Sequence, residues 1–168
     1  MNNITLIGMP GVGKSTLGVL LAKALGLRFL DTDLLIQSQE KKLLRDLIAE
    51  HGIDGFLAIE GQVCADLQTQ GAVIATGGSV VYEPRAMAHL KELGPVVYLK
   101  LDYPSLSRRL GSLKNRGVVL RPGQTLKMLY DERIPLYEGY ADLTIDCGGQ
   151  DIEGALAQVL EALRASEK

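Results

Sequence analysis

A glycine-rich stretch near the N-terminus has the residue types and spacing of a phosphate-binding loop. Residues 8–16, GMPGVGKST, match G-x-x-x-x-G-K-[ST] and carry an additional glycine, Gly11. Glycines let a loop wrap closely, so that its backbone N–H groups point at phosphate oxygens. Lys14 can reach the β- and γ-phosphates of a nucleotide, and the Ser15 hydroxyl suits Mg²⁺. The alternative is a glycine-rich turn with a solvated lysine, but the strand before and the helix after this stretch favour phosphate binding.

Two carboxylates lie where a magnesium nucleotide needs them. Asp31 and Asp33, in the sequence DTD, follow a short apolar stretch that has the composition of a strand. In open α/β sheets the carboxyl ends of the strands border the ligand crevice. Asp31 is therefore placed to hold Mg²⁺, directly or through water, and Asp33 to accept a proton from an attacking hydroxyl. One of the two could instead cap the following helix, and the two roles are compatible.

A second glycine-containing turn follows the next buried strand. Residues 76–79, TGGS, contain Gly77 and Gly78, which permit close approach of the backbone to a ligand or form only a tight turn. Arg133 lies in DERIPLY, and a single arginine on a helix is most often a surface charge. Three further residues, Cys64, His51 and His89, have no neighbours that would make them nucleophiles or ligands.

The elements that must position these residues alternate between strand and helix along the chain. Hydrophobic patterning predicts strands at 4–7, 29–30, 72–75, 96–99 and 143–145. Helices are predicted at 14–25, 34–50, 53–69, 84–93, 103–113, 124–139 and 151–165. Continuous apolar strands separated by helices favour a parallel sheet covered on both faces. We predict an α/β fold: a three-layer domain with a five-stranded parallel sheet.

One segment departs from this alternation. Residues 112–124, SLKNRGVVLRPGQ, contain glycines and no clear amphipathic period, and three of their side chains, Lys114, Arg116 and Arg121, are positively charged. Such a segment is typical of a mobile loop that covers a site. The alternative is a solvated surface loop without function.

Composition limits the classes of protein that this chain can be. Its 168 residues are typical of one domain, expected over 1–168, with a core large enough to need no disulfide or structural metal. Lys and Arg total 18 against 20 Asp and Glu, which disfavours nucleic acid as the main partner. The apolar runs are too short to span a membrane, and no signal-peptide pattern opens the sequence. We expect a cytoplasmic protein with two reduced cysteines, and a monomer as the simplest state.

Taken together, these motifs resemble the shikimate kinases over essentially the whole chain. The matching pieces are GMPGVGKST at 8–16, FLDTD at 29–33, TGGSV at 76–80, the basic loop, and ERIPLYEGYADLTID at 132–146. The last piece is the most specific, because that family has an arginine, then Pro-Leu-Tyr, then Ala-Asp before its final strand. The resemblance implies a P-loop, nucleoside-monophosphate-kinase-like fold. It also implies an ATP-dependent kinase that phosphorylates one hydroxyl of a small molecule under a closing lid, within aromatic amino acid biosynthesis.

The resemblance assigns the ATP half of the site. It implies that ATP binds to Gly11, Val12, Gly13, Lys14, Ser15, Thr16, Arg109 and Arg116. Lys14 would bind the transferring phosphoryl group, while Ser15 and Asp31 would hold Mg²⁺. Arg109 resembles the family arginine that stacks on adenine. Arg116 resembles the lid arginine that stabilises phosphoryl charge, with Arg121 as the competing candidate because the family lid usually has Arg-Pro.

The resemblance also assigns the acceptor half, with helices at about 34–69 and the lid at about 112–124. Asp33 would bind the acceptor hydroxyls and orient or activate the attacking one. Gly77 and Gly78 would contact the acceptor through backbone N–H groups, and Arg133 would bind its carboxylate. The residues implied in catalysis are Lys14, Asp33 and Arg116.

Two positions depart from the family pattern, and both concern the acceptor. The family has Phe-Arg-x-x-Glu in its acceptor helices, whereas this chain has Phe56-Leu57-Ala58-Ile59-Glu60. The family arginine is a second partner of the acceptor carboxylate. Because a charge-assisted hydrogen bond contributes roughly 1.5–3 kcal/mol, its loss would weaken shikimate binding about tenfold or more. The third family glycine is Ser79 here, which adds a side chain where the acceptor approaches.

The sequence leaves three possible functions open. The leading one is transfer of the γ-phosphoryl group of ATP to shikimate, giving shikimate 3-phosphate. A second is a related kinase whose acceptor is another small hydroxy compound such as homoserine, since Glu60 without a neighbouring arginine could meet an ammonium group. A third is a nucleotide-binding regulatory protein without phosphotransfer. The intact Lys14, Asp31 and Asp33 argue against the third.

Overall fold

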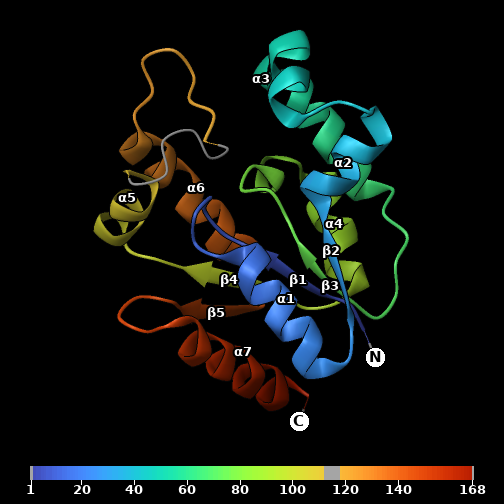
Figure 1. Ribbon diagram of the computed structural model, residues 1–168, viewed down its shortest axis with the longest axis vertical. Coiled ribbons are helices and arrows are strands. Elements are labelled where there is room, and N and C mark those ends of the chain that lie inside the picture. Colours follow the sequence, from blue (N-terminus) through green and yellow to red (C-terminus); the bar gives the residue numbers. More distant parts are fainter. Residues whose placement is uncertain (1, 112–117, 168) are drawn as a thin grey trace.

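A five-stranded parallel sheet forms the centre of the protein (Figure 1). The computed structural model describes residues 2–111 and 118–167. The strands are β1 (Ile4–Ile7), β2 (Arg28–Asp31), β3 (Ala72–Ala75), β4 (Val96–Lys100) and β5 (Leu143–Asp146). Their order in the sheet is β2-β3-β1-β4-β5, and every neighbouring pair is parallel. The predicted α/β class, strand number and parallel arrangement are confirmed.

Helices cover both faces of this sheet (Figure 1). Seven lie in the described part of the chain: α1 (Lys14–Leu25), α2 (Thr32–Glu40), α3 (Leu44–Ala65), α4 (Pro84–Leu93), α5 (Tyr103–Gly111), α6 (Leu126–Tyr140) and α7 (Ile152–Ser166). A short 3-10 helix, η1 (Val80–Tyr82), precedes α4. Helices α1 and α7 pack side by side on one face, and α4 and α6 pack on the other. Among the described residues, no helix is long and apolar enough to cross a membrane.

The register of the strands brings the functional loops to one edge of the sheet. Leu6 of β1 pairs with Ala75 of β3, and Asp31 of β2 pairs with the same Ala75. Residues 8–16, 31–33 and 76–79 therefore all leave the sheet at the same level. The helices after β1 and β3, α1 and α4, lie on opposite faces, and ligands of open α/β sheets bind at such a change of direction.

The prediction of one continuous helix over 34–50 is wrong, whereas the predicted break between 50 and 53 coincides with a non-helical residue, Gly52. Helix α2 ends at Glu40, Lys41 adopts a left-handed conformation with φ 54°, and α3 begins at Leu44. Helix α3 then continues past residue 50 to Ala65, with a kink at Gly52, where φ is 72° and ψ is 177°. The apolar stripe stays in phase across Lys41–Leu43, so hydrophobic spacing gave no sign of the break.

Helices α2 and α3 have a small core of their own. Ile36, Leu47, Phe56 and Val63 are buried against one another, separately from the main core of the sheet. This cluster holds α2 against α3 above the sheet edge. Phe56 also lines a cavity that lies over the carboxyl edge of the sheet. The two helices thus form a unit that positions one wall of that cavity. The remaining predicted helices match the structure within three residues at each end, although residues 112–113 of the helix predicted over 103–113 lie outside the described residues.

Candidate active site

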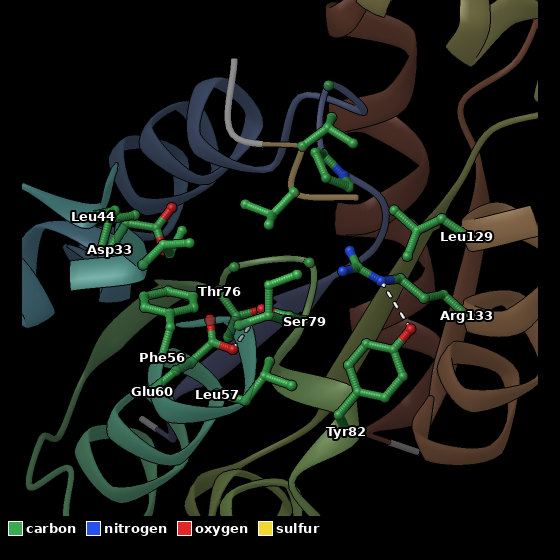
Figure 2. A pocket seen from close by; sticks show the side chains of 18 of the residues that line it. Asp33, Leu44, Phe56, Leu57, Glu60, Thr76, Ser79, Tyr82, Leu129 and Arg133 are labelled. Atoms are coloured by element: carbon green, nitrogen blue, oxygen red, sulfur yellow. Dashed lines mark hydrogen bonds between the residues drawn. The ribbon is translucent and has the colours of Figure 1, made fainter. Parts of the chain in front are cut away.

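A cavity of about 1140 Å³ lies over the carboxyl edge of the sheet. Its walls come from the loop 8–16, from α2, α3 and α6, from the turn 76–79 and from residues 118–124. Figure 2 shows Asp33 and Glu60 on one side of the cavity and the Arg133 guanidinium pointing into it from the other. Its volume is slightly above the range of roughly 300–1,000 Å³ that is typical of small-molecule sites.

The phosphate-binding loop ends where α1 begins. Gly13 has a left-handed backbone with φ 101°, which glycine adopts without strain, and its carbonyl accepts the first helical hydrogen bond from Leu17 N–H. Lys14 is the first helical residue and is buried. Its ammonium donates to the carbonyl oxygens of Gly8 at 2.7 Å and Met9 at 2.8 Å. The loop thus curls around the ammonium group at the N-terminus of a helix, the arrangement that binds phosphate.

Burial changes the acidity of this lysine. Desolvation lowers the pKa of Lys14 to about 8, while the carboxylates of Asp33 and Asp31 raise it and the Arg133 guanidinium lowers it further. Lys14 therefore remains mostly positively charged at neutral pH. A cation removed from water interacts more strongly with a phosphate than a solvated one does.

Helix α5 packs over the phosphate-binding loop. The Arg109 guanidinium donates to the carbonyl of Val12 at 3.2 Å, and a Cβ atom on Gly11 would lie 2.8 Å from the Leu110 side chain. The structure thus brings Arg109, predicted to stack on adenine, next to the loop predicted to bind the phosphates. Thr16 is exposed in the first turn of α1, beside Ser15.

Asp31 serves two local structures at once. Its Oδ1 atom accepts hydrogen bonds from Asp33 N–H at 2.9 Å and Leu34 N–H at 3.4 Å, which caps the N-terminus of α2. Its Oδ2 atom accepts a hydrogen bond from the Ser15 hydroxyl at 3.0 Å. The capping role considered from the sequence thus belongs to Asp31 and not to Asp33. Capping uses only the Oδ1 atom of Asp31, so its Oδ2 atom lies beside the phosphate-binding loop.

Asp33 lies half-buried on α2 and faces the cavity. Burial raises the pKa of this carboxyl group, the neighbouring Asp31 raises it further, and Lys14 opposes both. A carboxylate with a raised pKa is a better proton acceptor than one on the surface. Its position between Lys14 and the turn 76–79 suits a group that meets an acceptor hydroxyl.

The two glycines of the turn 76–79 lie against charged side chains. A Cβ atom on Gly77 would lie 2.5 Å from Glu60 Oε2 and 3.0 Å from Asp33 Oδ1. A Cβ atom on Gly78 would lie 2.9 Å from an Arg133 terminal nitrogen. Any larger residue at these two positions would displace the charged groups that border the cavity.

Arg133 is buried, unlike the surface arginine that is the common case on a helix. Its Nε–H donates to the Tyr82 hydroxyl at 3.3 Å, and its guanidinium carbon lies 5.3 Å from the centre of the Tyr82 ring. The Tyr82 hydroxyl in turn donates to Glu132 at 3.1 Å. Tyr82 therefore holds the guanidinium in place (Figure 2). Sequence reasoning missed Tyr82, although an aromatic residue three positions after a glycine-rich turn was a visible signal.

Glu60 and Ser79, which sequence reasoning treated separately, form a pair. The Ser79 hydroxyl donates to Glu60 Oε1 at 2.6 Å, joining the turn 76–79 to α3 (Figure 2). Leu57 lies one helical turn before Glu60 and lines the same cavity. The two departures from the family pattern thus meet at one carboxylate.

Four described residues of the basic loop border the cavity: Val118, Val119, Arg121 and Gln124. The Arg121 guanidinium forms a salt bridge with Asp54 of α3, with 2.6 Å between the nitrogen and the carboxylate oxygen. This contact joins the loop to the acceptor helices and raises the pKa of Arg121. Arg116, the other candidate lid arginine, lies outside the described residues, as does Lys114.

Neither cysteine is placed for chemistry. Cys64 and Cys147 are both free and buried, and burial raises the pKa of Cys64 to about 12 and that of Cys147 to about 11. Both are therefore protonated thiols at neutral pH, which are poor nucleophiles. Within residues 2–111 and 118–167, no group of three His, Cys, Asp or Glu side chains could hold a metal ion.

Comparison with known proteins identifies the family. The family model described as shikimate kinase matches residues 10–164. The shikimate kinase of Thermobifida fusca is 35% identical over 96% of this chain and 94% of its own length. That of Thiobacillus denitrificans is 36% identical over 91% of this chain and 85% of its own length.

A solved structure agrees with these sequence relatives. The shikimate kinase of Acinetobacter baumannii, in complex with shikimate, superimposes with a TM-score of 0.89 at 31% identity, covering 99% of this chain and 94% of the other. The fold, the phosphate-binding loop and the matches over nearly the full chain all indicate the same family. This chain therefore belongs to the shikimate kinase family and is an ATP-dependent small-molecule kinase.

Proposed function

We propose that the protein transfers the γ-phosphoryl group of ATP to a hydroxyl of shikimate, giving shikimate 3-phosphate. The observation that carries this proposal is the opposition of Arg133 and Asp33 across one cavity beside Lys14 (Figure 2). Shikimate has a carboxylate at one end of its ring and hydroxyls at the other. A buried guanidinium and a carboxylate on facing walls match that distribution of charge.

In this mechanism, the phosphate-binding loop holds the donor. Backbone N–H groups of residues 11–16 and the N-terminus of α1 bind the phosphates, while Lys14 neutralises charge on the group in transfer. Arg109, which contacts the loop at Val12, binds the adenine side of ATP. We assign the lid arginine to Arg116, with Arg121 as the alternative supported by its position at the cavity.

The acceptor is held between the two walls. Arg133 binds its carboxylate, and Gly77 and Gly78 allow the ring to approach the backbone closely. Asp33 accepts a hydrogen bond from the attacking hydroxyl and takes its proton as the new P–O bond forms and the bond to ADP breaks. Residues 112–124 form the lid, and α2 and α3 form the acceptor-binding part of one kinase domain over 1–168.

The residues beside the loop fit Mg²⁺. Ser15 and Asp31 offer a hydroxyl and a carboxylate in contact with each other, and Mg²⁺ prefers a few oxygen ligands together with substrate phosphates and water. Mg²⁺ bound there with ATP would neutralise charge on the phosphate oxygens. Asp31 would keep its capping bonds to α2 through its other oxygen.

Coupled ADP release with Mg-ATP tests the proposal directly. Shikimate, homoserine and several other hydroxy acids are compared side by side with the purified protein. Turnover with shikimate at micromolar to millimolar concentration supports the proposed acceptor. Absence of shikimate-dependent ADP release at millimolar concentration rejects it. We also propose that the kinase is cytoplasmic and monomeric. Light scattering of the same sample tests the monomeric state.

Restoring the family arginine should improve shikimate binding. Leu57 lines the cavity on the same side as Glu60, so Leu57→Arg would add a second cation for the acceptor carboxylate. We expect the KM for shikimate to fall about tenfold, since one charge-assisted hydrogen bond is gained. Steady-state kinetics measures this, and Leu57→Met controls for the change of side-chain shape. A KM unchanged by the arginine would show that position 57 does not face the carboxylate.

Removing the Tyr82 hydroxyl should loosen Arg133. Tyr82→Phe keeps the ring that lies against the guanidinium but removes the oxygen that accepts from Arg133 Nε–H. Because the guanidinium is then held by fewer contacts, we expect the KM for shikimate to rise about three- to tenfold while kcat changes little. Equal changes in the KM values for shikimate and ATP would contradict this assignment.

One observation supports a second candidate acceptor. Glu60 is buried, lines the cavity and has one carboxylate oxygen without a hydrogen-bond partner among the described residues. With Leu57 in place of the family arginine, this oxygen could receive an ammonium group, as in homoserine. Glu60→Gln would then raise the KM for homoserine strongly, and an unchanged KM would count against this acceptor.

A further inference from the structure

Glu60 is hydrogen-bonded at one carboxylate oxygen and, among the described residues, unpaired at the other. Its side chain is 0% exposed, and Oε1 accepts the Ser79 hydroxyl proton at 2.6 Å. Within the described part of the chain, Oε2 has no hydrogen-bond partner, and Glu60 forms no salt bridge within 4 Å. A buried carboxylate oxygen is seldom left unpaired in a native protein, so one that belongs to a residue lining a binding cavity indicates a ligand that supplies the donor.

The unpaired oxygen lies against Gly77, on the acceptor side of the cavity. A Cβ atom on Gly77 would lie 2.5 Å from Glu60 Oε2 and 3.0 Å from Asp33 Oδ1, so both carboxylates lie against the same glycine. Leu57, one turn earlier on α3, contributes an apolar surface next to Glu60 and no competing charge (Figure 2). An acceptor bound at Asp33 therefore lies on the same side of the cavity as Glu60.

Ser79 fixes the orientation of the Glu60 carboxylate. It is the residue before η1, with φ −89° and ψ −5°, and the only proton of its hydroxyl is donated to Oε1. This bond joins the turn 76–79 to α3 across 19 residues of sequence. A rotation of the carboxylate would break the bond, so Ser79 restricts Glu60 to one orientation.

We propose that Ser79 is a positioning residue that holds the Glu60 carboxylate so that its second oxygen accepts a hydrogen bond from a hydroxyl or ammonium group of the acceptor. This proposal rests on the proposed kinase function and specifies how its acceptor site differs from one with glycine at position 79. Ser79 still lines the cavity, and its hydroxyl points to Glu60.

The acidity of Glu60 makes this positioning measurable. Burial raises the pKa of Glu60 to about 7, the Ser79 hydrogen bond lowers it, Asp33 on α2 raises it, Arg133 on α6 lowers it, and Glu83 before α4 raises it. Glu60 accepts a donor best when ionised, so acceptor binding weakens as the pH falls through the pKa of Glu60. Without the Ser79 hydroxyl, this pKa rises and the weakening begins at higher pH.

The test compares three substitutions of Ser79 and one control. We expect Ser79→Ala and Ser79→Gly to raise the KM for the acceptor about tenfold, with kcat and the KM for ATP within about twofold of wild type. In the profile of kcat/KM for the acceptor against pH, the acid limb should move to higher pH. Ser79→Thr, which keeps a hydroxyl, should restore both values. Ser38→Ala, at an exposed position of α2 away from the cavity, is the matched control.

The design separates this proposal from the proposed function. Wild-type turnover of shikimate tests the function, whereas the ratio of variant to wild-type KM, on whichever of shikimate and homoserine is phosphorylated, tests Ser79. If neither is phosphorylated, NMR titration of the Glu60 carboxyl in wild type and Ser79→Ala decides, and an unmoved pKa overturns the proposal. An unchanged KM for the acceptor in Ser79→Ala also overturns the proposal. Equal rises in the KM values for acceptor and ATP, together with a lowered Tm, overturn it too, because they indicate a general loss of structure. An effect confined to homoserine assigns the donor as an ammonium group, and one seen with shikimate assigns it as a hydroxyl.

Discussion

Replacing Lys14 with methionine is expected to reduce kcat about 100- to 1,000-fold, the loss typical of removing one preorganised electrostatic contact from a transition state. The ammonium group is buried in the phosphate-binding loop, 2.7 Å from the Gly8 carbonyl and 2.8 Å from that of Met9. A charge held in this way, out of water, needs no reorganisation when negative charge moves during phosphoryl transfer. Coupled ADP release at saturating ATP and acceptor measures the loss.

The fold should survive this substitution. Methionine keeps most of the aliphatic length of the lysine side chain, and the charge it removes is one that burial already disfavours, as the pKa of about 8 indicates. Circular dichroism and thermal melting should therefore match wild type. Lys23→Met, an exposed lysine near the end of the same helix, is the control and should keep full activity. Loss of activity in that control, or a kcat of Lys14→Met above a tenth of wild type, would contradict the role of Lys14.

The ATP half of the molecule was predictable because its signals are local. The phosphate-binding loop is a continuous motif between a short apolar strand and an amphipathic helix, and α1 occupies the predicted residues 14–25. Its chemistry follows from backbone N–H groups and one lysine that are neighbours in sequence as well as in space. Helix α4 also matches its predicted residues, 84–93, because a proline and a glycine mark its two ends.

The acceptor half was less predictable because it depends on contacts between distant residues. Hydrophobic spacing could not show that the chain breaks at Lys41, since the apolar stripe continues in phase across Lys41–Leu43. Nor could it show that Tyr82 would hold Arg133, 51 residues further on. Such contacts exist only after the turn 76–79, α3 and α6 have met above the sheet.

The pair of Ser79 and Glu60 shows why single positions were hard to interpret from sequence. Considered alone, Ser79 adds bulk to a glycine turn, and Leu57 removes a cation. In the structure the serine hydroxyl binds the glutamate that stands one turn after the leucine. The two changes are therefore local adjustments around one buried carboxylate. Their combined effect on the acceptor site is not the sum of two separate losses.

Replacing Asp33 with asparagine is expected to reduce kcat about 100- to 10,000-fold, the range for loss of a positioned general base. Asparagine has the same shape and still accepts a hydrogen bond from the attacking hydroxyl, but it cannot take the proton. The side chain of Asp33 does not cap α2, since Asp31 provides both capping bonds, so the helix should remain intact.

The split between kcat and the two KM values identifies what Asp33 does. Because it lies against Gly77 on the acceptor side, the KM for ATP should stay within about twofold of wild type. Asp131→Asn, at an exposed position of α6, is the matched control and should leave kcat unchanged. If Asp33→Asn retained kcat and raised only the acceptor KM, the carboxylate would bind the acceptor without accepting its proton. Proton removal would then fall to solvent, to the phosphate itself or to Glu60, the other carboxylate against Gly77.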